Sequence, residues 1–530
     1  MFKSTIKYFF LFCTLASYSQ TGKWTWVRGD TILGSLGNYG IKGLPSSTNE
    51  PPARYESIEW TDAQGNFWVY GGEDAAGTLC DLWRYNPITN IWTWVSGDSI
   101  HNFLGVYGTQ GVSSPTNSPP SSSVAISWSS LDGDLWMFSG YGNFCNTLWR
   151  YNISSNQWTW MKGDTANCEP VYGIKGISSV FNTPGYRLET SCSWVDNVGN
   201  LWLFGGDGKA SGFSSGYLND LWKYNTITNE WTWISGDSIP NIPSVYGTLG
   251  VASINNTPGG RYVYASWKDN LDNFWLFGGA YFTFENKNDL WKFNPLTNEW
   301  TWMNGSSLVN QTGSYGIKGI ESSSNFPGAR YETRSRWTDA CGDFWLYGGH
   351  GGGFFNDLWK YNVSNGKWTW VSGDTLNWYS PPIYGTMGVA SYTNKPGGRQ
   401  GANAFRRGNE LWLFGGFTSD PSAWIPLENT LWKFTPDSVC SGGLSIAENV
   451  ATEDYYKIYV YPNPSKGFFN IESRNKNGEI GIYNLVGQKI YSSKITNYIT
   501  EINLSQLPSG IYMIVVQSNN IVLSEKLIKE

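Results

Sequence analysis

Glu299-Trp300-Thr301-Trp302-Met303 ends a unit of sequence that recurs along most of the chain, and this recurrence decides the fold. The tripeptide Trp-Thr-Trp occurs six times, and successive copies lie 66 to 73 residues apart. The second tryptophans of the six copies are Trp26, Trp94, Trp160, Trp233, Trp302 and Trp370. Self-similarity at a nearly constant period indicates a repeat architecture.

Each period holds four short runs rich in aromatic and branched residues, and Gly, Asn or Asp turns separate them. In the fourth period these runs are 261–267, 273–279, 289–294 and 299–303. Four antiparallel strands per repeat, with a period above about 40 residues, are typical of a propeller blade and not of a solenoid turn. The 62 Gly, 31 Trp and 32 Tyr among 530 residues favour such sheets and tight turns.

The two ends of the repeat region complement each other. A run ending in Gly-Gly, or Ser139-Gly140 in the second unit, occurs six times, but the run 431–434 after its last copy is followed by no Trp-Thr-Trp. The run 23–27 at the N-terminus lacks its three partner strands. We expect these two runs to pair and close the ring, since closure removes open sheet edges. The predicted fold is all-β: a six-bladed β-propeller closed by the N-terminal strand, followed by a small C-terminal β-sandwich.

The diglycine is followed by a Tyr, six residues and a Trp, as in Tyr224 and Trp231 or Tyr361 and Trp368. This pattern resembles the kelch repeat of galactose-oxidase-like propellers, and the resemblance covers residues 20–436. The units are longer than the usual kelch repeat, and the second lacks the Arg that opens the first run elsewhere.

The first 19 residues resemble a secretory signal peptide. Lys3 and Lys7 precede the short apolar run 8–15, and small residues lie at 17 and 19. No other segment is long and apolar enough to span a bilayer. We therefore expect the chain to leave the cytoplasm, without a membrane span in the mature protein.

Residues 437–455 are polar and turn-rich and are predicted to be a linker, and 456–530 alternate in the manner of a small β-sandwich. Tyr461, Pro462, Asn463 and Pro464 with Gly467, together with the lysines at 526 and 529, resemble a type IX secretion (Por) C-terminal sorting domain. The resemblance implies Bacteroidetes-type export across the outer membrane, with the secretion machinery and surface lipopolysaccharide as partners. The alternative is an ordinary accessory β-domain.

Composition excludes several functions. The net charge of −6, without a basic block, argues against nucleic-acid binding. The two histidines, His101 and His350, lie far apart, which argues against a histidine-built metal centre or a galactose-oxidase-like copper site. No cofactor or metal ligand is predicted. The six cysteines after the signal suggest one or two structural bridges plus buried thiols.

Candidate ligand-binding residues lie on the face predicted to carry the long loops. Binding residues concentrate on long, variable loops held by a rigid scaffold. The aromatic candidates are Tyr281, Phe282, Phe354, Phe355 and Trp424, within a wider set that includes Tyr217 and Phe417; alternatively, these rings cover their own loops. The basic candidates, which bind carboxylate or sulfate if they are free, are Arg54, Arg187, Arg261, Arg330 and Arg399. The alternative for the arginines is a structural ring, neutralised by Glu56, Glu189 and Glu332.

These features predict a secreted or cell-surface binding and adhesion protein for a glycan or protein ligand. The alternative is a carbohydrate-active enzyme, a glycosidase or lyase, on the same scaffold. A glycosidase needs paired carboxylates, and no spacing singles out such a pair. No catalytic residue is therefore predicted, and an enzyme is the less favoured interpretation.

Overall fold

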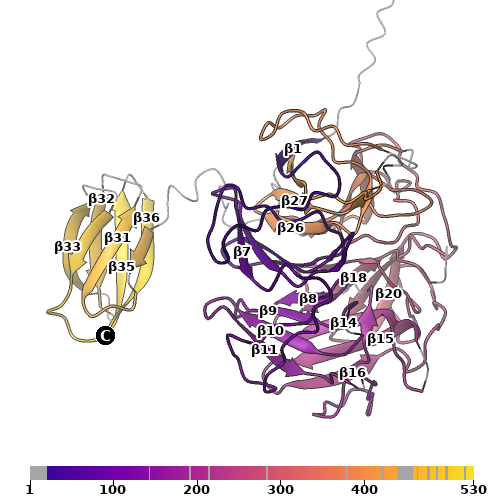
Figure 1. The fold of residues 1–530 in the computed structure, drawn as a ribbon, viewed down its shortest axis with the longest axis horizontal. Helices are drawn as coiled ribbons and strands as arrows, with labels where there is room; N and C mark the ends of the chain where they lie inside the picture. Colours follow the sequence, from indigo (N-terminus) through magenta and orange to yellow (C-terminus); the bar gives the residue numbers. More distant parts are fainter. Residues whose placement is uncertain are drawn as a thin grey trace, which may run out of the picture. The chain divides into compact units, whose positions relative to one another are not determined.

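The computed structural model describes residues 21–437 and 458–530, apart from short gaps at 143, 167, 190–192, 213–214, 282–284, 376–379, 419, 421–422, 462, 474–477, 485–487, 496–498 and 519–520. The predicted signal peptide and most of the predicted linker lie outside these residues. The chain divides into two compact units, Met1–Ser441 and Gly442–Glu530. All regular structure in the described residues is β-strand (Figure 1). None of it is a helix that could cross a membrane.

Six antiparallel sheets, here named sheets I to VI in chain order, make up the first unit. Sheet I contains β2 (Ile58–Thr61), β3 (Phe67–Tyr70), β6 (Leu82–Asn86) and β7 (Ile91–Ser96). Sheet II contains β8 (Ile126–Ser129), β9 (Leu135–Phe138), β10 (Leu148–Asn152) and β11 (Gln157–Lys162). Sheet III contains β14 (Leu201–Gly208), β15 (Gly216–Asn225) and β16 (Glu230–Ser235), with β12 (Arg187–Leu188) and β13 (Ser193–Val195) on β14.

The remaining sheets repeat this order. Sheet IV contains β17 (Ala265–Lys268), β18 (Phe274–Phe277), β19 (Leu290–Asn294) and β20 (Glu299–Asn304). Sheet V contains β21 (Arg336–Thr338), β22 (Phe344–Tyr347), β23 (Leu358–Asn362) and β24 (Lys367–Ser372). Sheet VI contains β26 (Asn403–Arg407), β27 (Glu410–Phe414), β29 (Leu431–Pro436) and β1 (Gly22–Arg28). Two short ribbons pair β4 (Glu73–Asp74) with β5 (Gly77–Thr78), and β25 (Arg399–Gln400) with β28 (Phe417–Thr418).

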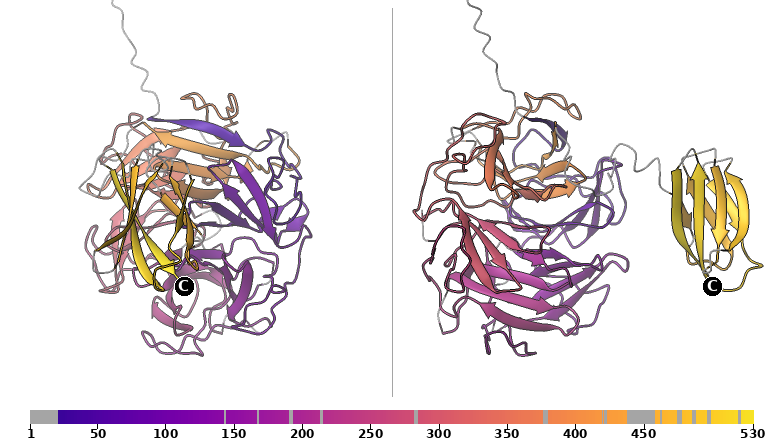
Figure 2. Two further views of the ribbon diagram at one scale, coloured as in Figure 1. Left: turned by 90° about the vertical axis from the view of Figure 1, so that its left-hand side faces the viewer. Right: turned by 180° about the vertical axis from the view of Figure 1, so that it is seen from behind.

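The N-terminal strand belongs to the last sheet, as predicted. In β1, Trp24 lies opposite Phe434 and Trp26 opposite Trp432 of β29. Figure 2 shows this indigo strand beside the orange strands of sheet VI. Trp24 is fully buried, and its ring contacts Phe434 and Tyr347 at centroid distances of 5.1 and 5.4 Å. The missing fourth strand of the last repeat therefore comes from the start of the chain.

The first strand of each sheet is shorter than the sequence predicts. In the fourth unit the predicted run 261–267 becomes β17, which starts only at Ala265. Val263 has a φ of +47°, in the left-handed region where a strand cannot continue, and Arg261 is held in an ion pair. The residues before the strand are thus used for other contacts.

The apolar core lies between consecutive sheets. Each of six buried clusters draws residues from two neighbouring sheets, and the last joins Phe405 and Phe414 of sheet VI to Phe67 and Trp83 of sheet I. Indole N–H groups add a directional link, because each donates to a main-chain carbonyl of the next sheet. These donors are Trp60, Trp128, Trp194, Trp267 and Trp337. In sheet VI the equivalent residue is Phe405, which has no donor and instead stacks on Phe67 at 4.7 Å.

The second unit is a pair of sheets around one apolar core. One sheet contains β30 (Ile458–Tyr461), β31 (Phe468–Ser473) and β34 (Ile499–Asn503). The other contains β33 (Lys489–Ile495), β32 (Gly478–Tyr483), β35 (Gly510–Ser518) and β36 (Ile521–Lys529). Phe469, Ile480, Ile514 and Leu527 are among the buried residues that both sheets contribute. This arrangement agrees with the small sandwich that the alternating pattern predicts.

Candidate functional site

The five candidate arginines are buried and paired. Each side chain is 0–1% exposed and lies 2.5 to 2.8 Å from a carboxylate that is equally buried. Arg330, for example, donates from both terminal nitrogens to Asp357, at 2.7 and 2.8 Å. The pairs are Arg54–Asp81, Arg187–Asp220, Arg261–Asp289, Arg330–Asp357 and Arg399–Glu428.

Comparison of equivalent positions in the six sheets indicates a structural role for these pairs. Sheet II has no such arginine, and Thr147 stands at the place of the aspartate. The aspartates also accept a hydrogen bond from the tyrosine of the repeated Tyr-Gly motif, as Asp81 does from Tyr39 at 2.7 Å. A buried charge is retained where it is paired and hydrogen-bonded. In these five sheets the arginine therefore holds the sheet to its preceding loop, and its side chain is not available to a ligand.

Glu56, Glu189 and Glu332 do not neutralise these arginines, in contrast to the alternative drawn from the sequence. Their carboxylates converge instead, and one oxygen of each lies within 4.8 Å of the others. Burial and the neighbouring carboxylates raise the pKa of all three groups, and that of Glu332 reaches about 8. We call these three residues the glutamate cluster.

Aromatic rings beside the cluster form an unbroken series, which we call the aromatic arc. Neighbouring ring centroids are 4.8 to 6.5 Å apart, and every ring is half-buried, so part of its surface reaches solvent. In order along the arc the rings are Tyr217, Tyr262, Tyr331, His350, Phe354, Phe417 and Tyr55. They come from sheets III, IV, V, VI and I. Burial lowers the pKa of His350, so its imidazole is neutral at neutral pH.

Acidic groups flank the arc. Glu73 accepts a hydrogen bond from the Tyr55 hydroxyl, and burial raises the pKa of Glu73. Burial also raises the pKa of Asp207, whose backbone pairs with that of Tyr217. The arc therefore combines aromatic faces with carboxylates and phenol groups at its edge.

The predicted aromatic residues lie in different surroundings, and not all of them belong to the aromatic arc. Phe354 belongs to the arc, whereas Phe355 is buried against the Arg330 guanidinium, 3.9 Å from its ring centroid. Tyr281 is partly buried and donates to the carbonyl of Asn241 at 2.8 Å. Trp424 is 97% exposed, and Phe282 lies outside the described residues.

Sequence reasoning missed Tyr55, Tyr262, Tyr331 and His350. A signal was present, because each tyrosine directly follows a repeated arginine and His350 directly follows a diglycine. The two positions come together because the segment before each first strand pairs with the segment after the diglycine, as Tyr331 does with His350.

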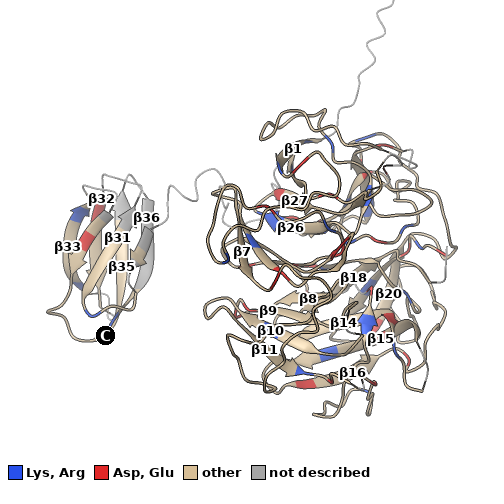
Figure 3. Ribbon diagram, in the orientation of Figure 1, with Lys and Arg blue, Asp and Glu red and all other residues tan. Residues whose placement is uncertain are grey.

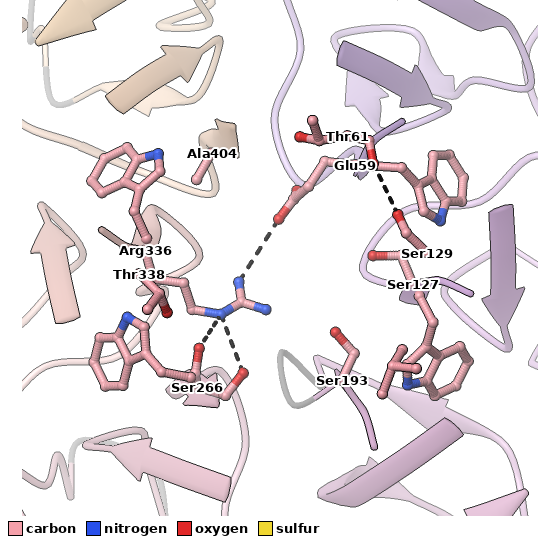
Figure 4. A pocket seen from close by; sticks show the side chains of 14 residues that line it. Glu59, Thr61, Ser127, Ser129, Ser193, Ser266, Arg336, Thr338 and Ala404 are labelled. Atoms are coloured by element: carbon pink, nitrogen blue, oxygen red, sulfur yellow. Dashed lines mark hydrogen bonds and ion pairs between the residues drawn. The ribbon is translucent and has the colours of Figure 1, made fainter. Parts of the chain in front are cut away.

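A polar cavity of 250 Å³ lies between the innermost strands of all six sheets. Figure 4 shows Arg336 reaching across it toward Glu59, at 3.7 Å, while its Nε donates to the carbonyl oxygen of Ser266 at 2.9 Å. Serine and threonine side chains make up much of the remaining lining. A cavity of this size and polarity suits a few water molecules or one small polar solute.

Charged side chains are few on the strands of the first unit, and Figure 3 shows them as separate blue and red segments. The aspartates in the turns between the first and second strands accept local hydrogen bonds. Asp62, for example, accepts from the backbone N–H of Gln64 and Asn66 and from the Trp68 indole. Cys145 and Cys168 form a disulfide, Cys341 is also disulfide-bonded, and Cys80 is a buried free thiol.

The predicted sorting motif lies against the end of the chain. Asn463 accepts a hydrogen bond from the backbone N–H of Ile528 at 2.8 Å. Ser465 donates to the Ile528 carbonyl and accepts from the N–H of Glu530, at 3.1 and 2.9 Å. Pro462 lies outside the described residues, and the side chain of Tyr461 is likewise not described. The motif and the terminal strand β36 thus form one structural element.

Residues 459–530 match the family of secretion system C-terminal sorting domains. No match to a curated protein was found for the chain. The tail makes the protein a substrate of the type IX secretion machinery, which delivers it to the cell surface or the exterior.

Proposed function

We propose that residues 20–436 form a six-bladed kelch-type β-propeller whose ring is closed by β1. Three observations support closure: the β1–β29 pairing, the apolar cluster shared by sheets VI and I, and the stacking of Phe405 on Phe67. A closed ring leaves no sheet edge open, which suits a protein that works outside the cell.

We further propose that this propeller is a binding and adhesion module for a glycan, displayed after type IX secretion, with surface lipopolysaccharide as its attachment partner. The aromatic arc is the observation that carries this proposal. Aromatic faces stack on the apolar faces of sugar rings, and half-exposed rings offer that contact without first being uncovered. Glu73 and Asp207 at its edge can accept hydrogen bonds from sugar hydroxyls. The charged groups described beside the arc are the acids Glu73 and Asp207, which favours a neutral ligand over an anionic one.

The test is a glycan array followed by titration calorimetry on the purified mature protein. A double change of Tyr331→Ala and Phe354→Ala should weaken the best glycan by about 2 kcal/mol, because a few aromatic anchors carry most binding energy. Thr297→Ala is the matched control, since it lies in the β19–β20 turn. Equal affinity of the double variant and the wild type would contradict the site.

The enzyme alternative rests on the carboxyls of raised pKa beside the arc, because catalytic acids are often tuned in this way. Product analysis during the same incubations separates the two functions. Cleavage of the bound glycan by the wild type, lost in Glu73→Gln with binding retained, would favour a glycosidase or lyase.

A further inference from the structure

The three residues of the glutamate cluster precede the inner strands of alternate sheets, namely sheets I, III and V. Six equivalent residues precede the inner strands of sheets I to VI, and all have φ values between +47° and +61°. In chain order they are Glu56, Val124, Glu189, Val263, Glu332 and Gly401. Main-chain hydrogen bonds link neighbours in this series, as from Val124 N to Glu56 O at 3.0 Å and from Val263 N to Glu189 O at 2.7 Å. Glutamates thus alternate with residues that carry no polar side chain.

Two of the three carboxylates have a buried oxygen that the protein leaves without a partner, while Glu56 and Glu332 also hydrogen-bond each other. Glu56 and Glu332 are each 6% exposed, and Glu189 is partly buried. One carboxylate oxygen of Glu189 and one of Glu332 are buried without a hydrogen-bond partner. A buried acceptor without a partner is costly, and a bound group that satisfies it stabilises the site.

Arg334 provides a second and independent observation. It is 4% exposed, and its Nη1 donates weakly to the carbonyl of Ser57 at 3.4 Å. Its Nε and Nη2 are buried without a hydrogen-bond partner, although its charge lowers the pKa of all three glutamates. Among the described residues it forms no ion pair within 4.0 Å with any of them. The Arg334 charge therefore acts on the glutamate cluster without a direct ion pair.

The glutamate cluster carries more negative charge than Arg334 can neutralise. When all three carboxyls are ionised, the glutamate cluster and the Arg334 guanidinium together carry two negative charges, which one divalent cation neutralises. Glu59 adds no net charge, because it is paired with Arg336, whereas Glu73 and Asp207 also act on the cluster and add negative charge. All candidate ligand atoms are carboxylate oxygens; these suit Ca²⁺ better than Zn²⁺, which prefers nitrogen and sulfur ligands, or Mg²⁺, which demands near-ideal octahedral geometry.

We propose that Glu56, Glu189 and Glu332 together bind one calcium ion at the base of the aromatic arc, with Arg334 balancing the remaining charge. This site does not depend on which ligand the arc binds. It does explain how three carboxylates can be kept together in the interior of the propeller outside the cell, where calcium is abundant relative to the affinity of extracellular sites.

The experiment is calorimetric titration of the EDTA-treated mature protein with calcium chloride alone. One ion should bind per chain, and the melting temperature should rise with calcium. Glu56→Gln and Glu332→Gln should each weaken binding about tenfold or more, because each removes one of three charged ligands. Glu321→Gln, an exposed acid in another part of the unit, is the matched control and should bind as the wild type does.

Equal calcium binding by the wild type and the two cluster variants would overturn the proposal, because the ion would then sit elsewhere. Absence of binding at about 10 mM calcium would also overturn it, and the carboxyls would then hold protons instead. If a glutamine variant does not fold, Glu56→Asp and Glu332→Asp decide, because each keeps the charge but shortens the side chain. Calcium binding unchanged in both aspartate variants would refute the site.

Discussion

The main-chain N–H of Glu56 donates to the carbonyl oxygen of Gly401 at 2.7 Å, which joins the segment before sheet I to the segment before sheet VI. Together with the pairing of Trp24 and Phe434, this bond makes the stability of the first unit depend on its two ends.

Removal of β1 should therefore destabilise the whole unit. Deleting residues 23–27 exposes the edge of β29 and should give an aggregating chain. The single change Trp24→Ala should lower the unfolding free energy by about 3–5 kcal/mol, since this indole is fully buried. Lys23→Ala, at the partly exposed neighbouring position, should cost less than about 1 kcal/mol. Denaturant unfolding and light scattering measure both effects. A truncated chain that stays monomeric and melts like the intact protein would refute closure by β1.

Breaking one buried ion pair should lower the stability of the first unit. It should not change whether the protein prefers a neutral or a charged ligand. Arg330→Met leaves the Asp357 carboxylate buried without its partner, so unfolding should become easier by about 3–5 kcal/mol. Lys367→Met removes a partly exposed pair with Glu321 and should cost less than about 1 kcal/mol. The double change Arg330→Met and Asp357→Leu should recover part of the loss. If Arg330→Met unfolds like the wild type but loses an anionic ligand, the arginine belongs to the binding site after all.

The glutamate cluster predicts a particular pH dependence in the absence of calcium. Glu332 has a pKa of about 8 in the folded protein, against about 4.3 for an ordinary glutamate in the unfolded chain. Between these values the folded state binds more protons, so stability should fall as pH rises through this range. Glu56 and Glu189 act in the same direction, and Arg334 opposes them.

Unfolding of the wild type and Glu332→Gln in EDTA from pH 5 to pH 9 tests this expectation. The variant should show a flatter profile, because one titrating carboxyl is gone. Glu50, whose pKa is raised to about 7, lies away from the cluster, so Glu50→Gln should remove a separate part of the slope. A Glu332→Gln profile parallel to that of the wild type would contradict the shifted pKa.

Surface display should depend on the close contact at Gly467. This residue has a φ of +130°, and an added Cβ would lie 2.7 Å from the Cα of Ser505. Gly467→Ala should therefore disturb the tail and leave more protein inside the cell, without affecting the first unit. Gly510→Ala is the matched control, since nothing lies within 4 Å of its added Cβ. Cell fractionation measures both. Undiminished display of a chain that lacks residues 459–530 would show that the tail is dispensable.

The strands and their order could be read from the sequence because each repeat carries the same pattern. The second strand of each repeat is a continuous apolar run, as in Phe67–Tyr70, and is typical of a strand buried on both faces. The six copies of Trp-Thr-Trp reinforce this pattern. The pairing of β1 with β29 followed from counting, since one strand was left over at each end. The sorting tail was readable for a similar reason, because its motif residues are local and occur in order.

The site could not be read in the same way, because its members are neighbours only in space. Tyr262 and Tyr331 lie 69 residues apart in the chain (331 − 262), yet their rings meet beside the glutamate cluster. The arginines illustrate the opposite case: a guanidinium before an inner strand suggests a charged opening, but Arg54 and Arg261 each lie against a buried aspartate 27 or 28 residues later. Local sequence specifies which backbone is strand, whereas the direction of a side chain before the strand depends on the φ of that residue and on the sheet packed beside it. The φ values and the packing of neighbouring sheets exist only in the folded protein. They bring the three glutamates together and pair each of the five arginines with its own carboxylate.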